Sequence, residues 1–411
     1  MMKKFEEQIN KYAQVIAKVG LNVQEGETVV ISSDIRALEL VRAVTAECYE
    51  LGAKQVITDL SDTDLTKLHI NHQSTDTLEE ILPYVQAKQD YYLNEKASML
   101  YIHSTSPEAL KDADTEKLMA ANRAGRQAAA ALSASRMRYD QNWCIIGYPS
   151  PEWAALVFPD LPQEEAEEKL MDYILKTVRV DQEDPVAAWD AHSKFLKSRA
   201  KWLSDYNFDR LKYTAPGTDL EIGLIDGARF TGGGHKNRKG LDIRVNMPTE
   251  EVFTSPDYRR VNGTVSNTLP LSYNGQIVDR FKLTFKNGVV TDFEAEQGYD
   301  VLRELLESDE GACRLGEAAL VPVDSPISNS GILYYNTLFD ENASCHIAIG
   351  KAYPGPVPGA NEMTDEEQDA IGLNHSLIHV DFMIGSKDLD IDGITRDGEI
   401  VPVFRQGNWV E

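Results

Sequence analysis

Glu27-Thr-Val-Val-Ile-Ser-Ser33 is a short run of mainly β-branched residues, and Ala53-Lys-Gln-Val-Ile-Thr-Asp59 is a second one. Between them, residues 36–51 carry apolar side chains at helical spacing, so the three segments predict a strand, a helix and a strand. Such a unit forms a parallel pair of strands with a right-handed connection. Ser98-Met-Leu-Tyr-Ile-His103 supplies a third strand. The N-terminal part is therefore predicted to be an α/β domain with an open, mostly parallel sheet.

The loop after the first strand argues against nucleotide binding. A turn that cradles phosphate needs glycines between the strand and the helix. The corresponding residues here are Ser32, Ser33 and Asp34, and none of them is glycine.

The pattern changes in the second half of the chain. Helical spacing continues to about residue 206, over 114–138, 164–177 and 190–206, with a strand at 143–147. From Leu211 onward, strands alternate with turns, and Asn287-Gly288 between two β-rich runs predicts a hairpin. We therefore predict an α/β domain over residues 1–195 and a mainly β (α+β) domain over residues 196–411.

Composition excludes several classes of protein. The 411 residues carry a formal net charge of −25, which disfavours nucleic acid as a partner, and they suffice for two or three domains. The first 20 residues predict an amphipathic helix rather than a signal peptide, and no run of about 18 apolar residues suggests a membrane span. We expect a cytoplasmic protein. The four cysteines form no C-x-x-C pair, so neither a zinc ribbon nor a disulfide framework is expected.

The candidate chemistry lies near the C-terminus. Three of the eight histidines fall between His346 and His379, two of them inside predicted strands. The other five lack a neighbouring cluster and are expected to be surface or packing residues; they are His69, His72, His103, His192 and His235. His379 and Asp381 are two apart, so they share one face of a strand and could bind a divalent cation together. A hydrogen-bonded His–Asp pair fits the same spacing.

Acidic residues open several apolar strands. Glu317 begins one, Glu341 precedes the strand of His346, and Glu250-Glu251 precede Val252. A carboxylate at such a position is costly unless it is solvated, paired or bound to metal. Together with the histidines, these acids supply enough ligands for two cations.

Four blocks of sequence carry a resemblance to a known family: Asn246–Pro256, Gly316–Pro322, Asp340–Gly350 and His379–Gly385. In their residues and their order, they resemble the blocks of the M29 metallopeptidases, the group of aminopeptidases T and S and PepS. The resemblance extends over essentially the whole chain.

The resemblance implies an aminopeptidase that releases N-terminal residues from short peptides at a dinuclear metal centre in the C-terminal domain. The residues at the family's ligand positions are Glu251, Glu317, Glu341, His346, His379 and Asp381, and Tyr353 matches an active-site tyrosine. It also implies a homodimer. Zn, Co and Mn all accept carboxylate and imidazole ligands, so the metal is left open. Glu250 and Glu251 are adjacent, and a slip of one residue would exchange them.

The residue types suit this chemistry. Glu317 is expected to bridge the ions or to act as general base, and Tyr353 to donate a hydrogen bond to the tetrahedral oxyanion. Glu250 or Asp340 could receive the substrate's α-amino group. The segment 231–240, which is rich in glycine and basic residues, is expected to be a hairpin tip, or else to hold the peptide's carboxylate.

Three rival hypotheses remain. A Ser-His-Asp hydrolase lacks the expected G-x-S-x-G elbow. A metal-free binding protein leaves the acids and the His-x-Asp strand unexplained. A metal-dependent hydrolase of another amide or ester would not require a free N-terminus.

Overall fold

The computed structural model describes residues 5–273 and 276–410. The chain divides into two compact units. Unit 1 comprises residues 1–191 and 234–248, and unit 2 comprises residues 192–233 and 249–411. The domain limits 1–195 and 196–411 stay a prediction.

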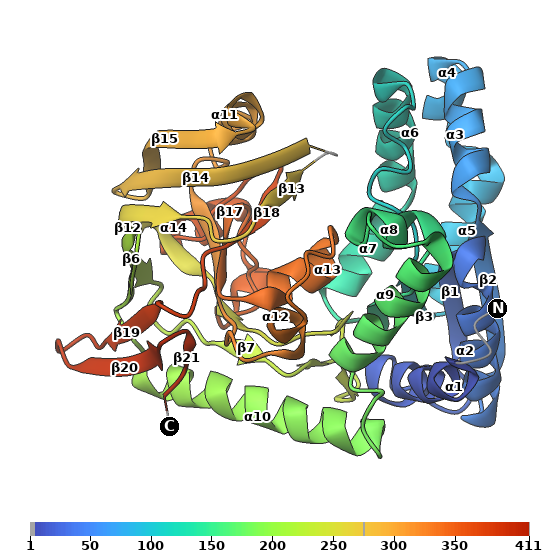
Figure 1. Ribbon diagram of the computed structural model, residues 1–411, viewed down its shortest axis with the longest axis horizontal. Helices are drawn as coiled ribbons and strands as arrows, with labels where there is room; N and C mark the ends of the chain where they lie inside the picture. Colours follow the sequence, from blue (N-terminus) through green and yellow to red (C-terminus); the bar gives the residue numbers. More distant parts are fainter. Residues whose placement is uncertain (1–4, 274–275, 411) are drawn as a thin grey trace. The chain divides into compact units, whose positions relative to one another are not determined.

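Unit 1 is built around a parallel sheet in the order β10-β4-β3-β1-β2. Figure 1 labels β1, β2 and β3 of this sheet. Its strands are β1 (Thr28–Asp34), β2 (Gln55–Ser61), β3 (Ser98–His103), β4 (Trp143–Gly147) and β10 (Asn246–Met247). The predicted parallel α/β sheet is therefore confirmed. Val29, Val30 and Ile31 in β1 are fully buried, as expected for a strand covered on both faces.

Helices connect and cover these strands. They are α1 (Glu6–Val15), α2 (Leu38–Glu50), α3 (Thr63–His72), α4 (Thr75–Glu79), α5 (Pro83–Asn94), α6 (Thr115–Ala128), α7 (Ala130–Met137), α8 (Pro151–Val157) and α9 (Gln163–Thr177). The predicted helical region 114–138 thus consists of α6 and α7. Residues 1–4 of the predicted first helix lie outside the described residues. No helix in the described part of the chain combines the length and the apolar character needed to span a membrane.

The loop after β1 contains no glycine, and the buried carboxylate of Asp34 holds its conformation. Asp34 Oδ1 accepts hydrogen bonds from the Arg36 N–H at 3.0 Å and from Arg36 Nη1 at 3.1 Å. Its Oδ2 accepts from Thr63 N at 2.9 Å and from Thr63 Oγ1 at 2.7 Å. Asp34 therefore ties the end of β1 to the start of α3.

The glycine-rich segment lies partly in unit 1. β8 (His235–Lys236) pairs with β9 (Asp242–Ile243) as a short hairpin. The His235 ring stacks on Tyr139 at 4.6 Å, and Arg238 forms an ion pair with Asp140. These contacts hold the basic side of the hairpin tip against Tyr139 and Asp140, which follow α7.

Unit 2 contains two larger sheets. The nine-stranded sheet has the order β13-β14-β12-β6-β5-β19-β20-β21, with β15 paired to β14. Its strands are β5 (Arg210–Ala215), β6 (Thr218–Leu224), β12 (Pro256–Ser266), β13 (Leu271–Tyr273), β14 (Gln276–Lys286), β15 (Val289–Gln297), β19 (Asp390–Ile394), β20 (Ile400–Arg405) and β21 (Asn408–Trp409). Asn287 and Gly288 have φ of 49° and 82°, so the predicted hairpin between β14 and β15 is confirmed.

The five-stranded sheet has the order β18-β17-β16-β11-β7 and is antiparallel. Its strands are β7 (Thr231–Gly232), β11 (Val252–Thr254), β16 (Leu315–Leu320), β17 (His346–Gly350) and β18 (His379–Met383). Unit 2 also contains the helices α11 (Tyr299–Leu306), α12 (Pro326–Ser330), α13 (Thr337–Asp340) and α14 (Asp365–Ile371). The 3₁₀ turn η4 (Glu341–Ala343) precedes β17. The predicted mainly β second region is confirmed.

One hydrophobic core serves both sheets of unit 2. It includes Leu220 and Phe281 from the larger sheet, and Ile347 and Phe382 from the smaller one. The later part of α10 (Pro185–Tyr206) joins this core through Leu196 and Leu203, among other residues. One face of the five-stranded sheet is therefore committed to packing.

The buried hydrogen bonds of Asp34 predict a stability that depends on pH. Burial alone would raise the pKa of this carboxyl, but the bonds from Arg36 and Thr63 outweigh it and lower the pKa. Above the unfolded pKa of about 3.9, Asp34 should stabilise the fold, and this contribution should vanish as the pH falls through the lower folded pKa. We expect Asp34→Asn to lose about 2 kcal/mol of unfolding free energy at pH 7, and progressively less below pH 4.

Asp64→Asn is the matched control, measured by urea unfolding across the same pH range. Asp64 pairs with the same Arg36 at 3.1 Å, but its side chain is 79% exposed, so a loss of at most about 0.5 kcal/mol is expected. Equal losses for the two variants at pH 7 would contradict the role given to Asp34.

Candidate metal centre

The free face of the five-stranded sheet carries the predicted ligands. Glu317 in β16 pairs with Ala348 in β17, which pairs with Asp381 in β18, so all three project from one face. His346 and His379 lie two residues from Ala348 and Asp381, respectively, and share that face. Alternate residues such as Val380 and Phe382 enter the core, as the sequence predicts.

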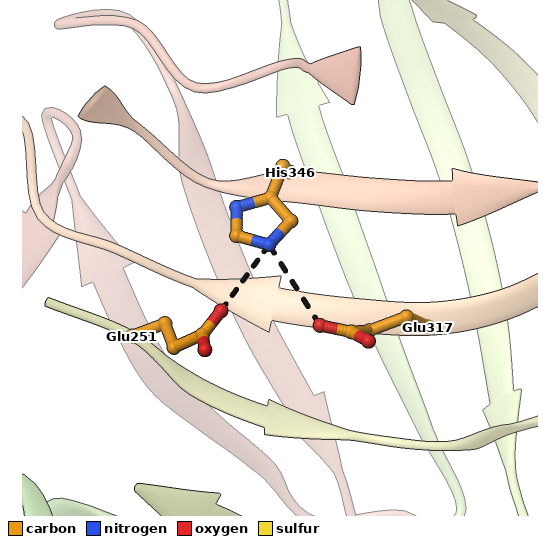
Figure 2. Close-up of side chains that lie close together, drawn as sticks. All are labelled: Glu251, Glu317 and His346. Atoms are coloured by element: carbon orange, nitrogen blue, oxygen red, sulfur yellow. Dashed lines mark ion pairs between the residues drawn. The ribbon is translucent and has the colours of Figure 1, made fainter. Parts of the chain in front are cut away.

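The first group consists of Glu251, Glu317 and His346, which come from three adjacent strands or strand ends (Figure 2). His346 Nε2 lies 3.4 Å from Glu251 Oε2 and 3.7 Å from Glu317 Oε1. Both carboxylates point toward the same nitrogen (Figure 2). The His346 side chain is 1% exposed, so its imidazole is covered by protein.

The second group consists of Glu317, His379 and Asp381. His379 Nε2 lies 3.5 Å from Glu317 Oε2 and 3.4 Å from Asp381 Oδ1. Glu317 therefore belongs to both groups and faces a different histidine with each of its two oxygens.

Backbone carbonyl groups fix the orientation of both imidazoles. His379 Nδ1 lies 2.6 Å from the Lys351 carbonyl oxygen, and His346 Nδ1 lies 3.3 Å from the Ser344 carbonyl oxygen. A carbonyl oxygen can only accept, so Nδ1 carries the proton in each ring. Nε2 then faces the carboxylates: it can carry a second proton beside them, and its lone pair is free to bind a metal ion once that proton is lost.

The distances in the cluster fit ligands of a shared cation better than hydrogen bonds. Charge-assisted N–H···O bonds are about 2.7–2.9 Å long. Two ligands at about 2.1 Å from one tetrahedral ion lie about 3.4 Å apart. The separations of 3.4–3.7 Å between Nε2 and the carboxylate oxygens match the second value, so the residues fit a metal ion.

Among the crowded carboxylates, the pKa values of the two histidines and of Glu341 are shifted upward. Burial alone would lower the pKa of His346 and His379, but the neighbouring carboxylates outweigh it: they raise the pKa of His346 well above its usual value and that of His379 to about 9. Burial, with the charges of Glu251 and Asp381, raises the pKa of Glu341 well above its usual value. The cluster thus attracts positive charge strongly.

Glu341 lies beside the two groups and belongs to neither. It occupies η4, immediately after α13, and its Oε1 accepts a hydrogen bond from Asn342 Nδ2 at 3.4 Å. The electrostatic effects of Glu251, Asp381 and Glu317 on it place it in the same cluster of acids.

The structure distinguishes Glu250 from Glu251. Glu251 faces His346, whereas the Glu250 carboxylate lies 3.4 Å from His192 Nε2 and is buried. His192 Nε2 also lies 2.8 Å from the Thr249 carbonyl oxygen. This geometry favours Glu251 as the ligand and gives Glu250 a supporting position.

Tyr353 lies beside the second group. Its ring centroid is 4.7 Å from that of His379 and 6.5 Å from that of Phe253, and its carbonyl accepts a hydrogen bond from Ser255 Oγ at 2.5 Å. Burial and the charge of Glu317 raise the pKa of its phenol, so the hydroxyl stays protonated and able to donate.

Asp340 has a structural environment. Its carboxylate is buried and accepts hydrogen bonds from Tyr334 N at 2.8 Å and Asn336 N at 2.9 Å. These bonds shape the loop before α13 and occupy both oxygens of the Asp340 carboxylate.

The sequence analysis singled out neither the contact of His192 with Glu250 nor the side chain of Asn342. His192 lies in α10, almost 60 residues before Glu250, and no local spacing connects them. Asn342 follows Glu341 directly in the sequence. Its position inside the Asp340–Gly350 block was the one signal that could have pointed to it.

The family model for the thermophilic metalloproteases, M29, matches residues 5–409. The chain belongs to this family. It is 45% identical over 409 residues to Aminopeptidase 2 of Geobacillus stearothermophilus, covering 99% of both chains, and 44% identical over 407 residues to Aminopeptidase PepS of Streptococcus thermophilus, covering 99% of this chain and 98% of that one. Its fold is similar to the structure of wild-type AmpT from Thermus thermophilus, with a TM-score of 0.93 at 36% identity, covering 99% of this chain and 100% of that one.

These comparisons confirm the predicted family, the fold class, and the assignment to the metal-dependent peptidases whose relatives are named aminopeptidases. The rival assignments as a serine hydrolase or a metal-free binding protein are not supported by this family membership.

A β-bulge next to Glu317 provides a test of the site's backbone. The register of β16 and β17 shifts between Leu315 and Glu317, so Gly316 is the extra residue. A Cβ at Gly316 would lie 2.3 Å from the Lys351 carbonyl oxygen, the group that orients His379. We expect Gly316→Ala to destabilise unit 2 by about 2 kcal/mol or more and to lower its metal content.

Gly355→Ala is the control, because a Cβ there meets no atom within 4 Å. Thermal unfolding and elemental analysis of both variants provide the comparison. If Gly316→Ala kept the metal content and melting temperature of Gly355→Ala, the bulge would not be needed.

Proposed function

We propose that this protein is an aminopeptidase that releases N-terminal amino acids from short peptides at a dinuclear metal centre. In this proposal, Glu251, Glu317 and His346 hold one ion, and Glu317, His379 and Asp381 hold the other. Glu341 is an additional ligand on the side of Glu251.

The observation that carries the proposal is that Glu317 belongs to both groups of candidate ligands. Its Oε1 faces His346 and its Oε2 faces His379, so one carboxylate can bridge two ions. This supports the bridging role of Glu317 over the role of general base.

Charge balance also supports two ions. Four carboxylates gathered in one cluster repel one another unless cations are bound. Two divalent ions would neutralise Glu251, Glu317, Glu341 and Asp381 while both imidazoles stay neutral.

The chemistry follows from these residues. Two divalent ions would lower the pKa of water and polarise the scissile carbonyl. Each carboxylate has two oxygens, so an oxygen of Glu251, Glu341 or Asp381 that binds no ion would accept the proton that water loses. The Tyr353 phenol, kept protonated by its surroundings, donates a hydrogen bond to the oxyanion that develops on the carbonyl.

Substrate recognition and assembly complete the proposal. Glu250, which is no ligand in this proposal, is left as the candidate carboxylate for the substrate's α-amino group. We also propose that the protein acts as a homodimer, as the family resemblance implies, and that it does so in the cytoplasm. Sedimentation analysis tests the dimer directly, and a monomer that is fully active would contradict it.

Hydrolysis of a panel of dipeptides with free N-termini tests the activity. We expect hydrolysis to stop after chelation and to return with Zn, Co or Mn, and N-acetylated peptides to resist cleavage. Cleavage of N-acetylated peptides at a similar rate would instead favour a broader amide hydrolase. No cleavage with any of the three metals would overturn the proposal.

Substitution of the ligands tests the number of ions. Wild-type protein should hold about two ions per chain, His379→Ala about one, and Glu317→Gln fewer still, with peptide hydrolysis reduced by at least about 100-fold in both variants. His375→Ala is the control, because His375 lies four residues before His379 and belongs to neither ligand group. Equal metal content in Glu317→Gln and His375→Ala would refute the bridging role.

A further inference from the structure

Asn342 is a fully buried amide next to the proposed metal centre, with an exposed fraction of 0%. Its Oδ1 accepts a hydrogen bond from the Glu250 backbone N–H at 2.7 Å. Its Nδ2 donates to the Leu338 carbonyl oxygen at 3.1 Å and to Glu341 Oε1 at 3.4 Å.

These bonds connect two parts of the chain that are about 90 residues apart. Glu250 immediately precedes Glu251, so its N–H fixes the backbone that presents Glu251 to His346. Leu338 lies in α13, and its bond with Asn342 fixes the turn that carries Glu341. One side chain therefore sets the separation between Glu251 and Glu341.

Only one orientation of the amide satisfies these partners. The Glu250 N–H requires an acceptor, whereas the Leu338 carbonyl and the Glu341 carboxylate require donors. Neither an aliphatic nor a carboxylate side chain provides both functions. The chemistry of the site thus selects asparagine.

We propose that Asn342 is a positioning residue that holds Glu251 and Glu341 at the spacing needed for the ion on their side of the centre. This inference rests on the proposed dinuclear site. It assigns Asn342 no contact with substrate and no direct contact with an ion. Glu317, His379 and Asp381, which would hold the other ion, lie in β16 and β18, and the three hydrogen bonds of the Asn342 side chain reach neither strand.

The unequal effect on the two ions makes the proposal testable. We would titrate apo-protein with Co²⁺ by calorimetry and by visible absorption, comparing wild type with Asn342→Ala. The weaker positioning of Glu251 and Glu341 should lower the affinity of one binding step by about 10- to 100-fold and leave the other within about threefold. The absorption bands assigned to the affected step should also change.

Asn267→Ala is the matched control. Asn267 accepts a hydrogen bond from Phe281 N and donates to the Leu269 carbonyl and to Asp279 Oδ1, the same three kinds of bond. It lies in unit 2, and its carboxylate partner is no proposed ligand. This variant should lose stability and bind both ions like wild type.

Asn342→Asp serves if Asn342→Ala does not fold, because it keeps the acceptor for the Glu250 N–H and nearly the same volume. It loses the donor to Glu341, so the same single step should change in affinity and in spectrum. Unchanged affinities and spectra for both steps in the folded variant, or an equal loss in both, would overturn the role of Asn342. A wild-type protein that binds fewer than two Co²⁺ ions would instead overturn the dinuclear site.

Discussion

Repulsion among four neighbouring carboxylates is the constraint that the five-stranded sheet of unit 2 has to withstand. Glu251, Glu317, Glu341 and Asp381 gather in one cluster at the sheet, and burial raises the pKa of Glu317 and Glu341. In contrast, Asp381 has a lowered pKa, because the charge and hydrogen bond of His379 outweigh the effect of its burial. A protein gains nothing in stability from collecting buried like charges. Their assembly is reasonable only if cations complete the cluster.

The sheet supplies the frame that resists this repulsion. Its opposite face belongs to the main hydrophobic core of unit 2, through residues such as Val252, Ile347 and Phe382. Small residues occupy the site face between the ligands: Ala348 separates Glu317 from Asp381, and Ala319 pairs with His346. Small side chains there would leave space for the proposed ions, while packing on the other face sets the positions of the strands.

The sequence predicted those features that depend on local pattern. Alternation in β18 placed His379 and Asp381 on one face, and the Asn287-Gly288 turn predicted its hairpin. Pairing between distant strands was beyond local pattern, because the proposed ligands extend from residue 251 to residue 381 and meet only through the order β18-β17-β16-β11. The resemblance to the M29 family grouped them as candidate ligands. The contact between His192 and Glu250 had no signal, since it depends on how α10 packs.

Folding and metal binding are therefore coupled in this architecture. The proposed ligands of each group come from two or more strands, so neither group exists until β11, β16, β17 and β18 have paired. In the unfolded chain, the same side chains are separated and bind ions weakly. Ions that bind only the folded state stabilise it. The acidic cluster that opposes folding in the apo-protein thus becomes, with ions bound, a cross-link between strands.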